Sequence, residues 1–351
     1  MNNKTVIVGM SGGVDSSVAA YLLKKQGYNV IGVTMDTTVA GANEENVNNT
    51  INDAKNVAKM LGISHYVLDF RDIFKKNVVD YFIEEYKNAR TPNPCNVCNR
   101  FVKWQALLDR FEEFGADYVA TGHYARIDKL SNGRYAIKNS ITADKDQTYA
   151  LYNLTQEQLS KTIMPVGEYT KDKIREIAKE IGLNVAEKPD SQDICFIPDK
   201  DYIAFIQKHG NFVPEEGNFV TTEGKIVGTH KGITNYTIGQ RKGLGIAMGH
   251  PVFVTKIDKN SNEVVLGENE DLFTDVVYVK DFNFMAIDSC DETKELLGKI
   301  RYSHKGTKCR LKQVDENVYE CKFEEKVRAA TPGQALVLYE GEYVAGGGII
   351  I

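Results

Sequence analysis

Apolar and polar positions follow two different rhythms along the first third of the chain. Short β-rich apolar runs are separated by longer stretches in which apolar residues recur with helical spacing, and Gly27, Gly62 and Gly115 end three of these stretches. The predicted strands and helices follow one another in the order 6–9, 16–26, 28–35, 46–61, 65–70, 73–86, 97–114 and 118–122. Strands separated by helices imply right-handed crossovers and a mostly parallel sheet with helices on both faces. We therefore predict an α/β domain over residues 1–208, with ligands bound beyond the carboxyl ends of its strands.

From about residue 210 the pattern changes to short β-rich runs between recurring glycines. A hairpin is predicted where 252–256 and 263–266 flank a polar turn. After residue 275 the predicted strands are 276–280, 299–302, 308–314, 317–323, 335–339 and 343–350. This pattern favours a small β-rich adaptor domain over 209–272 and a C-terminal β-barrel over 273–351. Within the α/β part, Asn132-Gly133 between two alternating runs predicts one more hairpin.

The first predicted strand leads directly into Ser11-Gly12-Gly13-Val14-Asp15-Ser16-Ser17. A strand, a tight glycine turn and a helix N-terminus present backbone N–H groups to an anion, and the serine hydroxyls add donors. The segment is neither a Walker loop nor the dinucleotide G-x-G-x-x-G motif. It resembles the S-G-G-x-D-S loop of the PP-loop ATP pyrophosphatases, which cleave ATP between the α- and β-phosphates. The alternative is a glycine turn that only joins a strand to a helix.

Composition narrows the class of protein. The 351 residues carry a net charge of −5, which argues against a wholly basic nucleic-acid coat but leaves room for a local basic surface. No run of eighteen apolar residues and no signal-peptide pattern occurs, so we expect no membrane association. Six cysteines scattered over this length do not form a disulfide framework. We expect a cytoplasmic protein that uses some of its thiols chemically.

Two of these cysteines lie three residues apart at the start of a predicted helix. Prolines precede Cys95 and Cys98, and Arg90, Arg100 and Lys103 add positive charge nearby. A helix N-terminus and nearby cations lower the pKa of a thiol and favour the thiolate. The segment therefore predicts a reactive or metal-binding pair, and the alternative is two small residues that pack in a helix cap.

A third cysteine strengthens the functional interpretation. Cys195 follows Asp190-Ser191-Gln192-Asp193 in a polar loop rather than in a core strand. Structural zinc needs four ligands, and only three of the cysteines are expected to converge, which disfavours zinc but not an iron–sulfur cluster with one open iron. The cysteines of the β-rich half are assigned to packing or to the surface.

These motifs recur together in one known family. The matching segments are the glycine loop, Thr91-Pro92-Asn93-Pro94 with Cys98-Asn99, Gly122-His123-Tyr124-Ala125, Lys145-Asp146-Gln147-Thr148-Tyr149, Ser191-Gln192-Asp193-Ile194-Cys195-Phe196, Thr237-Ile238-Gly239-Gln240-Arg241-Lys242-Gly243 and Thr331-Pro332-Gly333-Gln334. In this ordered set the chain resembles the tRNA-specific 2-thiouridylases, bacterial sulfurtransferases that replace O2 of the anticodon wobble uridine with sulfur. The resemblance runs from residue 7 to residue 334 and so covers nearly the whole chain.

The resemblance implies that ATP activates the base. In the family, uridine O2 attacks the α-phosphate and pyrophosphate leaves, with backbone donors and Mg²⁺ stabilising the developing charge. The residues expected to bind ATP are Gly9, Met10, Ser11, Gly12, Gly13, Val14, Asp15 and Ser16, with Met35 and Gly122 at the adenosine part.

The resemblance also implies how sulfur arrives. Cys195 would carry a persulfide delivered by a cysteine desulfurase or a relay protein. Cys98 would attack that persulfide, freeing hydrosulfide or leaving a Cys98–Cys195 disulfide. Asn93, Pro94 and Cys95 would border the target base, which must leave the stack for chemistry at C2.

Cys95 departs from the family pattern, because better-known members have an aspartate there. The exchange leaves the acid/base or positioning role of that aspartate in doubt. It also creates a set of three thiols, Cys95, Cys98 and Cys195, that is able to hold a [4Fe-4S] cluster with one open iron. Related tRNA thiolases bind hydrosulfide at such an iron. We therefore consider two hypotheses, a cluster on these thiols and a persulfide route in which Cys95 is a bystander.

Contact with the anticodon stem-loop of tRNA is expected from local basic surfaces. The segment 299–312 carries six Lys and Arg and no acid, and strand alternation would place Lys308, Arg310 and Lys312 on one face. The alternative is a solvated strand face. By the resemblance, further tRNA contacts are His123, Lys145, Asp146, Gln147, Arg301, Tyr302 and Gln334.

Two other classes of protein remain as alternatives. A PP-loop adenylating ligase acting on a small acid would use the same loop, but it usually needs an ammonia source, and no glutaminase-like segment is present. A non-catalytic RNA-binding or redox protein would need the cysteines and the basic tail but not the intact loop.

Overall fold

The computed structural model describes residues 3–39, 44–185, 194–197 and 199–351. Its first part is built on a parallel sheet in the order β3-β2-β1-β4-β7. The strand bounds are β1 (Thr5–Gly9), β2 (Asn29–Asp36), β3 (Ser64–Asp69), β4 (Tyr118–Ala120) and β7 (Thr162–Ile163). This arrangement confirms the predicted α/β fold.

Strand β1 lies in the middle of the sheet, and its side chains point to two different cores. Ile7 packs into a cluster with Phe82 and Trp104, whereas Val6 and Val8 belong to a second cluster on the other face. Successive side chains of a strand point to opposite faces, so helices cover the sheet on both sides. The second cluster includes residues of α1 (Val14–Lys25), α2 (Glu44–Leu61) and α9 (Lys171–Glu180).

Two long helices expected from the sequence are each interrupted. The predicted helix 73–86 consists of α3 (Arg71–Phe74), a π-helix η1 (Lys75–Val79) and α4 (Asp80–Lys87). The predicted helix 97–114 consists of α5 (Pro94–Val97), a π-helix η2 (Cys98–Gln105), α6 (Ala106–Leu108) and α7 (Phe111–Phe114). A π-helix bonds residue i+5 to residue i, so it rotates the following residues relative to a 3.6-residue repeat. Such segments are frequent at functional sites.

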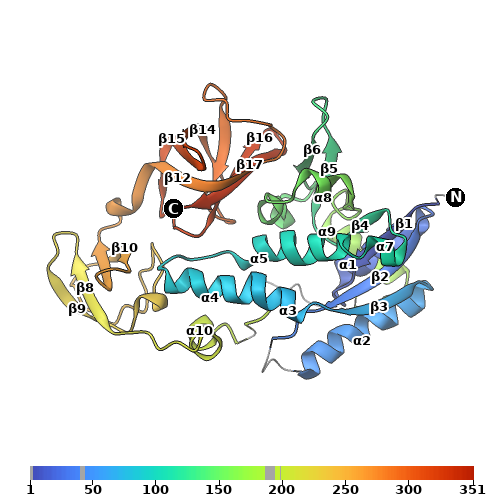
Figure 1. The fold of residues 1–351 in the computed structure, drawn as a ribbon, viewed down its shortest axis with the longest axis horizontal. Coiled ribbons are helices and arrows are strands. Elements are labelled where there is room, and N and C mark those ends of the chain that lie inside the picture. Colours follow the sequence, from blue (N-terminus) through green and yellow to red (C-terminus); the bar gives the residue numbers. More distant parts are fainter. Residues whose placement is uncertain (1–2, 40–43, 186–193, 198) are drawn as a thin grey trace.

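The second and third parts of the chain are β-rich, as expected. The central sheet has the order β10-β11-β8-β9, with β8 (Gly217–Thr221), β9 (Ile226–His230), β10 (Phe253–Asp258) and β11 (Glu263–Gly267). The barrel strands run β12-β15-β14-β13-β16-β17, and pairing of β12 with β17 closes the barrel. Their bounds are β12 (Phe273–Phe284), β13 (Leu296–Lys299), β14 (Thr307–Asp315), β15 (Val318–Arg328), β16 (Ala335–Glu340) and β17 (Tyr343–Ile350). In Figure 1 the barrel, in orange and red, lies above the α/β part.

The remaining elements are short. They are α8 (Gln156–Ser160), α10 (Tyr202–Gly210) and the 3₁₀ turns η3 (Ala143–Lys145), η4 (Thr148–Leu151), η5 (Ile233–Asn235) and η6 (Glu270–Leu272). The strand predicted at 299–302 was misplaced, because β13 ends at Lys299 and the next residues form a turn. The boundaries predicted at 208/209 and 272/273 stay predictions. Among the described residues, no helix is long and apolar enough to cross a bilayer.

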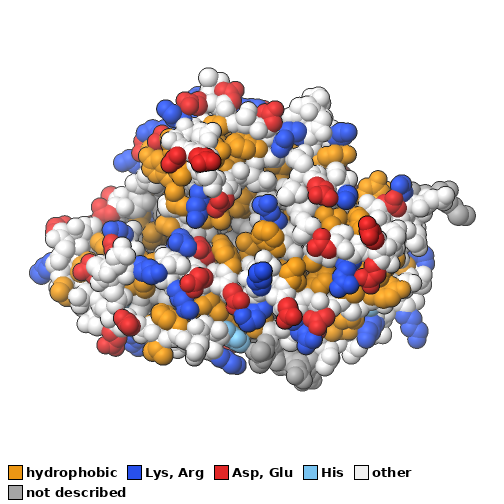
Figure 2. Space-filling view, in the orientation of Figure 1, with side chains coloured by type: hydrophobic (Ala, Val, Ile, Leu, Met, Phe, Trp, Pro, Cys, Tyr) orange, Lys and Arg blue, Asp and Glu red, His pale blue; other side chains and the backbone are white. Residues whose placement is uncertain are grey.

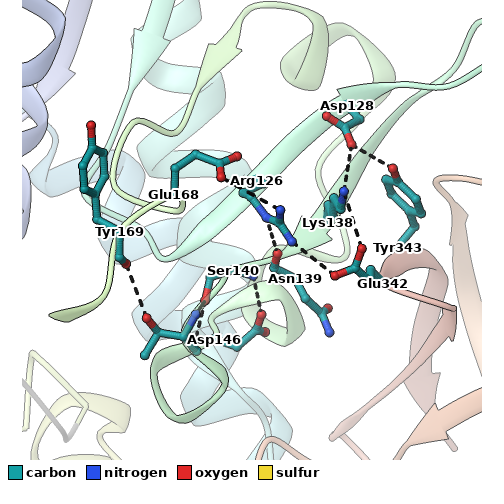
Figure 3. A network of polar contacts seen from close by, with 11 residues as sticks. Arg126, Asp128, Lys138, Asn139, Ser140, Asp146, Glu168, Tyr169, Glu342 and Tyr343 are labelled. Carbon is teal, nitrogen blue, oxygen red and sulfur yellow. Dashed lines mark hydrogen bonds and ion pairs between the residues drawn. The ribbon is translucent and has the colours of Figure 1, made fainter. Parts of the chain in front are cut away.

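A hairpin of the α/β part joins the barrel sheet. It consists of β5 (Ala125–Lys129) and β6 (Tyr135–Asn139), and β6 pairs with β17. Figure 3 shows the polar network at this junction. Glu342 lies 3.4 Å from Arg126 and 3.5 Å from Lys138, and the Tyr343 hydroxyl donates to Asp128 at 2.8 Å. These contacts attach the barrel to the part of the chain that carries the glycine loop.

Candidate nucleotide and thiol site

The glycine loop is built for close backbone approach. Gly12 has a φ of +66°, and a Cβ there would lie 2.6 Å from the Thr50 carbonyl oxygen, so both conformation and space require glycine. The Ser16 hydroxyl accepts from the Ser11 N–H at 3.2 Å and donates to the Gly13 carbonyl at 3.2 Å. Gly13 precedes α1 and has no side chain to cap it. The strand, glycine turn and helix N-terminus that the sequence predicts are therefore present, and nucleotide binding by their N–H groups stays a prediction.

Asp15 has a different role from its neighbours in the loop. Both of its carboxylate oxygens accept from the Lys171 ammonium at 2.8 Å, and one also accepts from the Tyr124 hydroxyl at 2.7 Å. Lys171 is buried, with 7% of its surface exposed. Asp15 therefore ties the start of α1 to α9, and its predicted part in ATP binding stays a prediction. The sequence offered no signal for Lys171, because it lies 156 positions away.

Three segments of the predicted ATP site meet at the carboxyl end of the sheet. A Cβ on Gly9 would lie 3.5 Å from Met35 Cε, which places the ends of β1 and β2 in contact. A Cβ on Gly122 would lie 2.5 Å from the Ser16 nitrogen. The backbone after β4 thus packs directly against the first turn of α1, and only glycine allows this approach.

The thiols lie around the start of the π-helix η2. Asn93 caps α5 by accepting from the Cys95 N–H at 3.1 Å. Cys95 and Cys195 are exposed and Cys98 is half-buried. Each of the other two thiols acts electrostatically on Cys98, so the structure brings the three predicted cysteines together. Their neighbours Ser191, Gln192 and Asp193 lie outside the described residues.

Cys98 does not have the lowered pKa that the sequence predicted. Burial raises the pKa of Cys98 to about 12, and Lys103 opposes this shift. Cys98 begins η2 rather than the first turn of a helix, so it gains little from a helix N-terminus. The expectation failed because burial, which the sequence does not reveal, disfavours the charged form.

The cluster hypothesis finds no support in this arrangement. Within the described residues, which include Cys95, Cys98 and Cys195, no group of three or more His, Cys, Asp or Glu side chains is placed to hold a metal ion. The residues present therefore do not fit a [4Fe-4S] cluster.

The three cations expected beside the thiols have separate surroundings. Arg90 forms an ion pair with Glu85, and the guanidinium of Arg100 lies 5.3 Å from the centre of the Phe101 ring. Lys103 is the cation that acts on Cys98 and Cys195. The positive charge at the thiols thus comes from Lys103.

His123 connects the loop side of the site to the thiol side. It follows Gly122, its Nδ1 lies 2.8 Å from the Thr121 hydroxyl, and its ring lies 5.5 Å from that of Trp104 on η2. Burial, with a contribution from Lys103, holds the pKa of His123 well below its usual value, so the ring is neutral at pH 7.

The other predicted tRNA contacts lie on two neighbouring surfaces. The Tyr302 hydroxyl donates to the Asp146 carbonyl at 3.0 Å, which brings 301–302 against the 145–147 loop. Gln147 accepts from the Tyr124 N–H at 2.8 Å, and Arg301 donates to the Arg328 carbonyl at 2.8 Å. These side chains already have partners within the chain. Their contact with RNA stays a prediction.

The basic face predicted on β14 is present but paired. Lys308, Arg310 and Lys312 are exposed, and the residues between them are buried, as strand alternation predicts. However, Lys308 lies 2.8 Å from Glu295, and Arg310 lies 3.8 Å from both Glu295 and Glu324. In Figure 2, positive and negative side chains are interspersed over the visible face. The structure favours a solvated strand face over a phosphate-binding one, because acids already pair with two of the three basic side chains. The basic segment alone did not reveal these pairs, because both acids lie outside it.

Comparisons with known proteins give a consistent result. Family models match residues 4–199 (tRNA methyl transferase HUP domain), 203–268 (tRNA methyl transferase PRC-barrel domain) and 274–350 (Aminomethyltransferase beta-barrel domain). The tRNA-specific 2-thiouridylase MnmA of Lachnoclostridium phytofermentans is 57% identical, with 99% of each chain covered. That of Clostridioides difficile is 53% identical, over 99% of this chain and 98% of the relative.

A solved structure, the U34-tRNA thiolase NcsA from Methanococcus maripaludis with its [4Fe-4S] cluster, is 18% identical over 61% of this chain and 66% of its own, with a TM-score of 0.36. This similarity is too distant to bear on the site. The curated relatives, by contrast, match the chain from end to end at more than half of its positions. The chain therefore belongs to the family of tRNA-specific 2-thiouridylases.

Proposed function

We propose that this chain is a sulfurtransferase that thiolates the wobble uridine of a tRNA anticodon at C2, using ATP to activate the base. One observation carries the proposal. The Gly122-His123 segment contacts both halves of the site, because Gly122 packs on the first turn of α1 and His123 packs on the helix that carries Cys98. A nucleotide at the glycine loop and a nucleophile at the thiols would thus act on the same base.

The activation half needs the loop. Oxygen at C2 is a poor leaving group, so uridine O2 attacks the α-phosphate of ATP, and pyrophosphate departs with the electron pair of the broken P–O bond. Backbone N–H groups of Gly12 to Ser16 would stabilise the charge that develops on the leaving group. ATP is expected to bring Mg²⁺, which would neutralise phosphate charge. Since the Asp15 carboxylate already bonds to Lys171 and Tyr124, this loop acid is not available to the ion.

The transfer half needs the thiols. A persulfide-carrying donor, such as a cysteine desulfurase or a relay protein, would load Cys195. The Cys98 thiolate attacks the inner sulfur of that persulfide, so a Cys98–Cys195 disulfide forms and hydrosulfide leaves. Hydrosulfide then attacks C2, and AMP departs with the original oxygen. A reducing dithiol restores both cysteines.

The target base would enter beside Asn93, Pro94 and Cys95. Asn93 stabilises the turn that precedes η2 by accepting from the Cys95 N–H, and the Cys95 side chain is exposed there. A base paired or stacked in an anticodon loop must be extruded to reach this position. Methyl transfer, which the family-model descriptions mention, would leave three neighbouring thiols without a use.

A pyrophosphate-release assay separates the candidate functions. Release that depends on tRNA supports the proposal, release with a small acid supports an adenylating ligase, and no release supports a binding protein. Mass spectrometry of the wobble uridine from a deletion strain complemented with this chain then identifies the product. Anaerobic reconstitution with iron and sulfide tests the route of sulfur: visible charge-transfer absorbance that disappears in Cys95→Ala would restore the cluster hypothesis.

A further inference from the structure

The π-helix η2 changes which residues share a face with Cys98. Hydrogen bonds in a π-helix join residues five apart, so Lys103 lies one turn after Cys98 along η2 (Cys98–Gln105). In an α-helix, positions five apart would point about 140° away from each other. The unusual winding therefore turns the lysine toward the thiol side.

No described residue supplies a counter-charge to Lys103. It is half-buried between Val102 and Trp104, which are both fully buried. In the part of the chain that the structure describes, neither an ion pair nor a hydrogen bond of the Lys103 ammonium occurs. The other two cations of this segment differ, because Arg90 has Glu85 as its partner and Arg100 lies over the Phe101 ring.

The groups that face Lys103 are neutral at rest. They are Cys98 on the same helix, Cys195 from the polar loop, and His123 from the strand end, and Lys103 acts electrostatically on each of them. Cys95 completes the group of thiols, and no carboxylate among the described residues acts on Cys98 or Cys195. A partly desolvated ammonium among neutral groups favours the arrival of an anion, because pairing offsets the cost of desolvation.

We propose that Lys103 is the counter-charge for the sulfur anions of this site, the attacking Cys98 thiolate and the hydrosulfide that leaves. This inference rests on the proposed function, since that function supplies the persulfide on Cys195. As the Cys98–Cys195 bond forms, the negative charge moves from the Cys98 sulfur to the departing hydrosulfide. Lys103 compensates the charge before and after the step. It is a positioning and electrostatic residue rather than a nucleophile.

The inference is tested first without ATP, tRNA or a sulfur donor. The alkylation rate of Cys98 in the full chain is followed by peptide mass spectrometry as a function of pH. In Lys103→Met we expect the profile to shift to higher pH by about one unit, which slows alkylation about tenfold at pH 8. Lys103→Arg keeps the charge and should retain most of the rate. Lys76→Met is the matched control, because Lys76 is exposed on the other π-helix and the variant loses the same charge.

A second readout cancels changes in the accessibility of Cys98, because both reagents must reach the same thiol. Iodoacetate is anionic and iodoacetamide is neutral, so the ratio of their rates at Cys98 reports the local charge. We expect the ratio to fall several-fold in Lys103→Met and to stay unchanged in Lys76→Met. An unchanged ratio together with an unchanged pH profile would overturn the inference.

Turnover separates this inference from the proposed function. Lys103→Met should retain tRNA-dependent pyrophosphate release while it loses thiolation of the tRNA. If pyrophosphate release falls as much as thiolation, Lys103 serves the activation step and the inference is wrong. If the wild-type chain releases no pyrophosphate with tRNA, the proposed function fails, whereas the alkylation results still decide the charge at Cys98.

Discussion

The side-chain amide of Gln334 donates a hydrogen bond of 2.7 Å to the backbone carbonyl of Thr91. The Thr91 N–H in turn donates to the Pro332 carbonyl at 2.8 Å, and the Thr91 hydroxyl bonds to that of Thr237 at 3.2 Å. The barrel and the central part of the chain thus hold the segment that leads to Asn93 and the thiols. The sequence motifs around 91, 237 and 334 meet at this one residue.

This junction predicts how a change at Gln334 will act. Gln334→Ala removes one hydrogen bond, worth about 1 kcal/mol, from the segment that positions the target base. We expect kcat for tRNA thiolation to fall about fivefold with little change in KM. A residue that mainly contacted tRNA would instead raise KM. Steady-state kinetics with tRNA as the varied substrate decide between the two roles, and Gln334→Glu, which also lacks the donor, should reproduce the kcat effect.

Gly122 is predicted to be essential to nucleotide chemistry. An alanine Cβ there would lie 2.5 Å from the Ser16 nitrogen, so Gly122→Ala must displace the first turn of α1. We expect tRNA-dependent pyrophosphate release to fall at least about tenfold, because preorganised backbone donors account for effects of that order. Gly182→Ala is the control: its φ is +73° but no atom lies within 4 Å of the added Cβ. It should lower stability without affecting pyrophosphate release; equal activity of the two variants would contradict the prediction.

The Asp15–Lys171 pair is predicted to stabilise the fold. Lys171→Met removes the positive charge and keeps most of the apolar part of the side chain, whereas Asp15→Asn removes the negative charge that lies against the buried Lys171 ammonium. Removing one partner of a buried pair typically costs about 3–5 kcal/mol, and this pair, with a partly exposed carboxylate, should lie at or below that range. Urea unfolding should show that the double variant is more stable than Asp15→Asn alone. Strict additivity of the two single effects would show that the pair is not coupled.

The parts of this protein that sequence alone predicted depend on signals close together in the chain. The glycine loop, the strand before it and the helix after it occupy residues 5–25, and their chemistry is local. The contacts that the sequence did not predict connect positions far apart in the chain. They are Asp15 to Lys171, Thr91 to Gln334 and Lys308 to Glu295. The sequence did not predict the π-helix at Cys98 either, because its apolar residues fit a 3.6-residue repeat well enough to predict an α-helix. The burial that raises the pKa of Cys98 also depends on contacts that no local sequence signal reveals.

The ion pairs on β14 predict a weak electrostatic role for that strand in RNA binding. In Lys308→Ala, Glu295 can still pair with Arg310. Because Lys308 and Arg310 are both paired with acids in the wild type, we expect neither of them to neutralise a phosphate and release its counterions. We expect the slope of log Kd against log salt for tRNA to change by less than about half a unit. A loss of about one unit per lysine, as for a direct phosphate contact, would restore the basic face of β14 as a tRNA surface.

His123 predicts a component of the acid sensitivity of the fold. Its pKa lies well below the usual value because the ring is buried. Below pH 6.5 the unfolded chain therefore binds a proton at this position that the folded chain does not. Unfolding free energy should fall as the pH drops below about 6.5, by up to about 1.4 kcal/mol per pH unit from this one group, and the contribution is fully present above pH 6.5. His123→Gln should remove that part of the slope in urea titrations between pH 6.5 and 5. Equal slopes for wild type and His123→Gln would show that the His123 ring is protonated in the folded protein over this pH range. The protonated ring would then add a second positive charge, beside that of Lys103, between the glycine loop and the thiols.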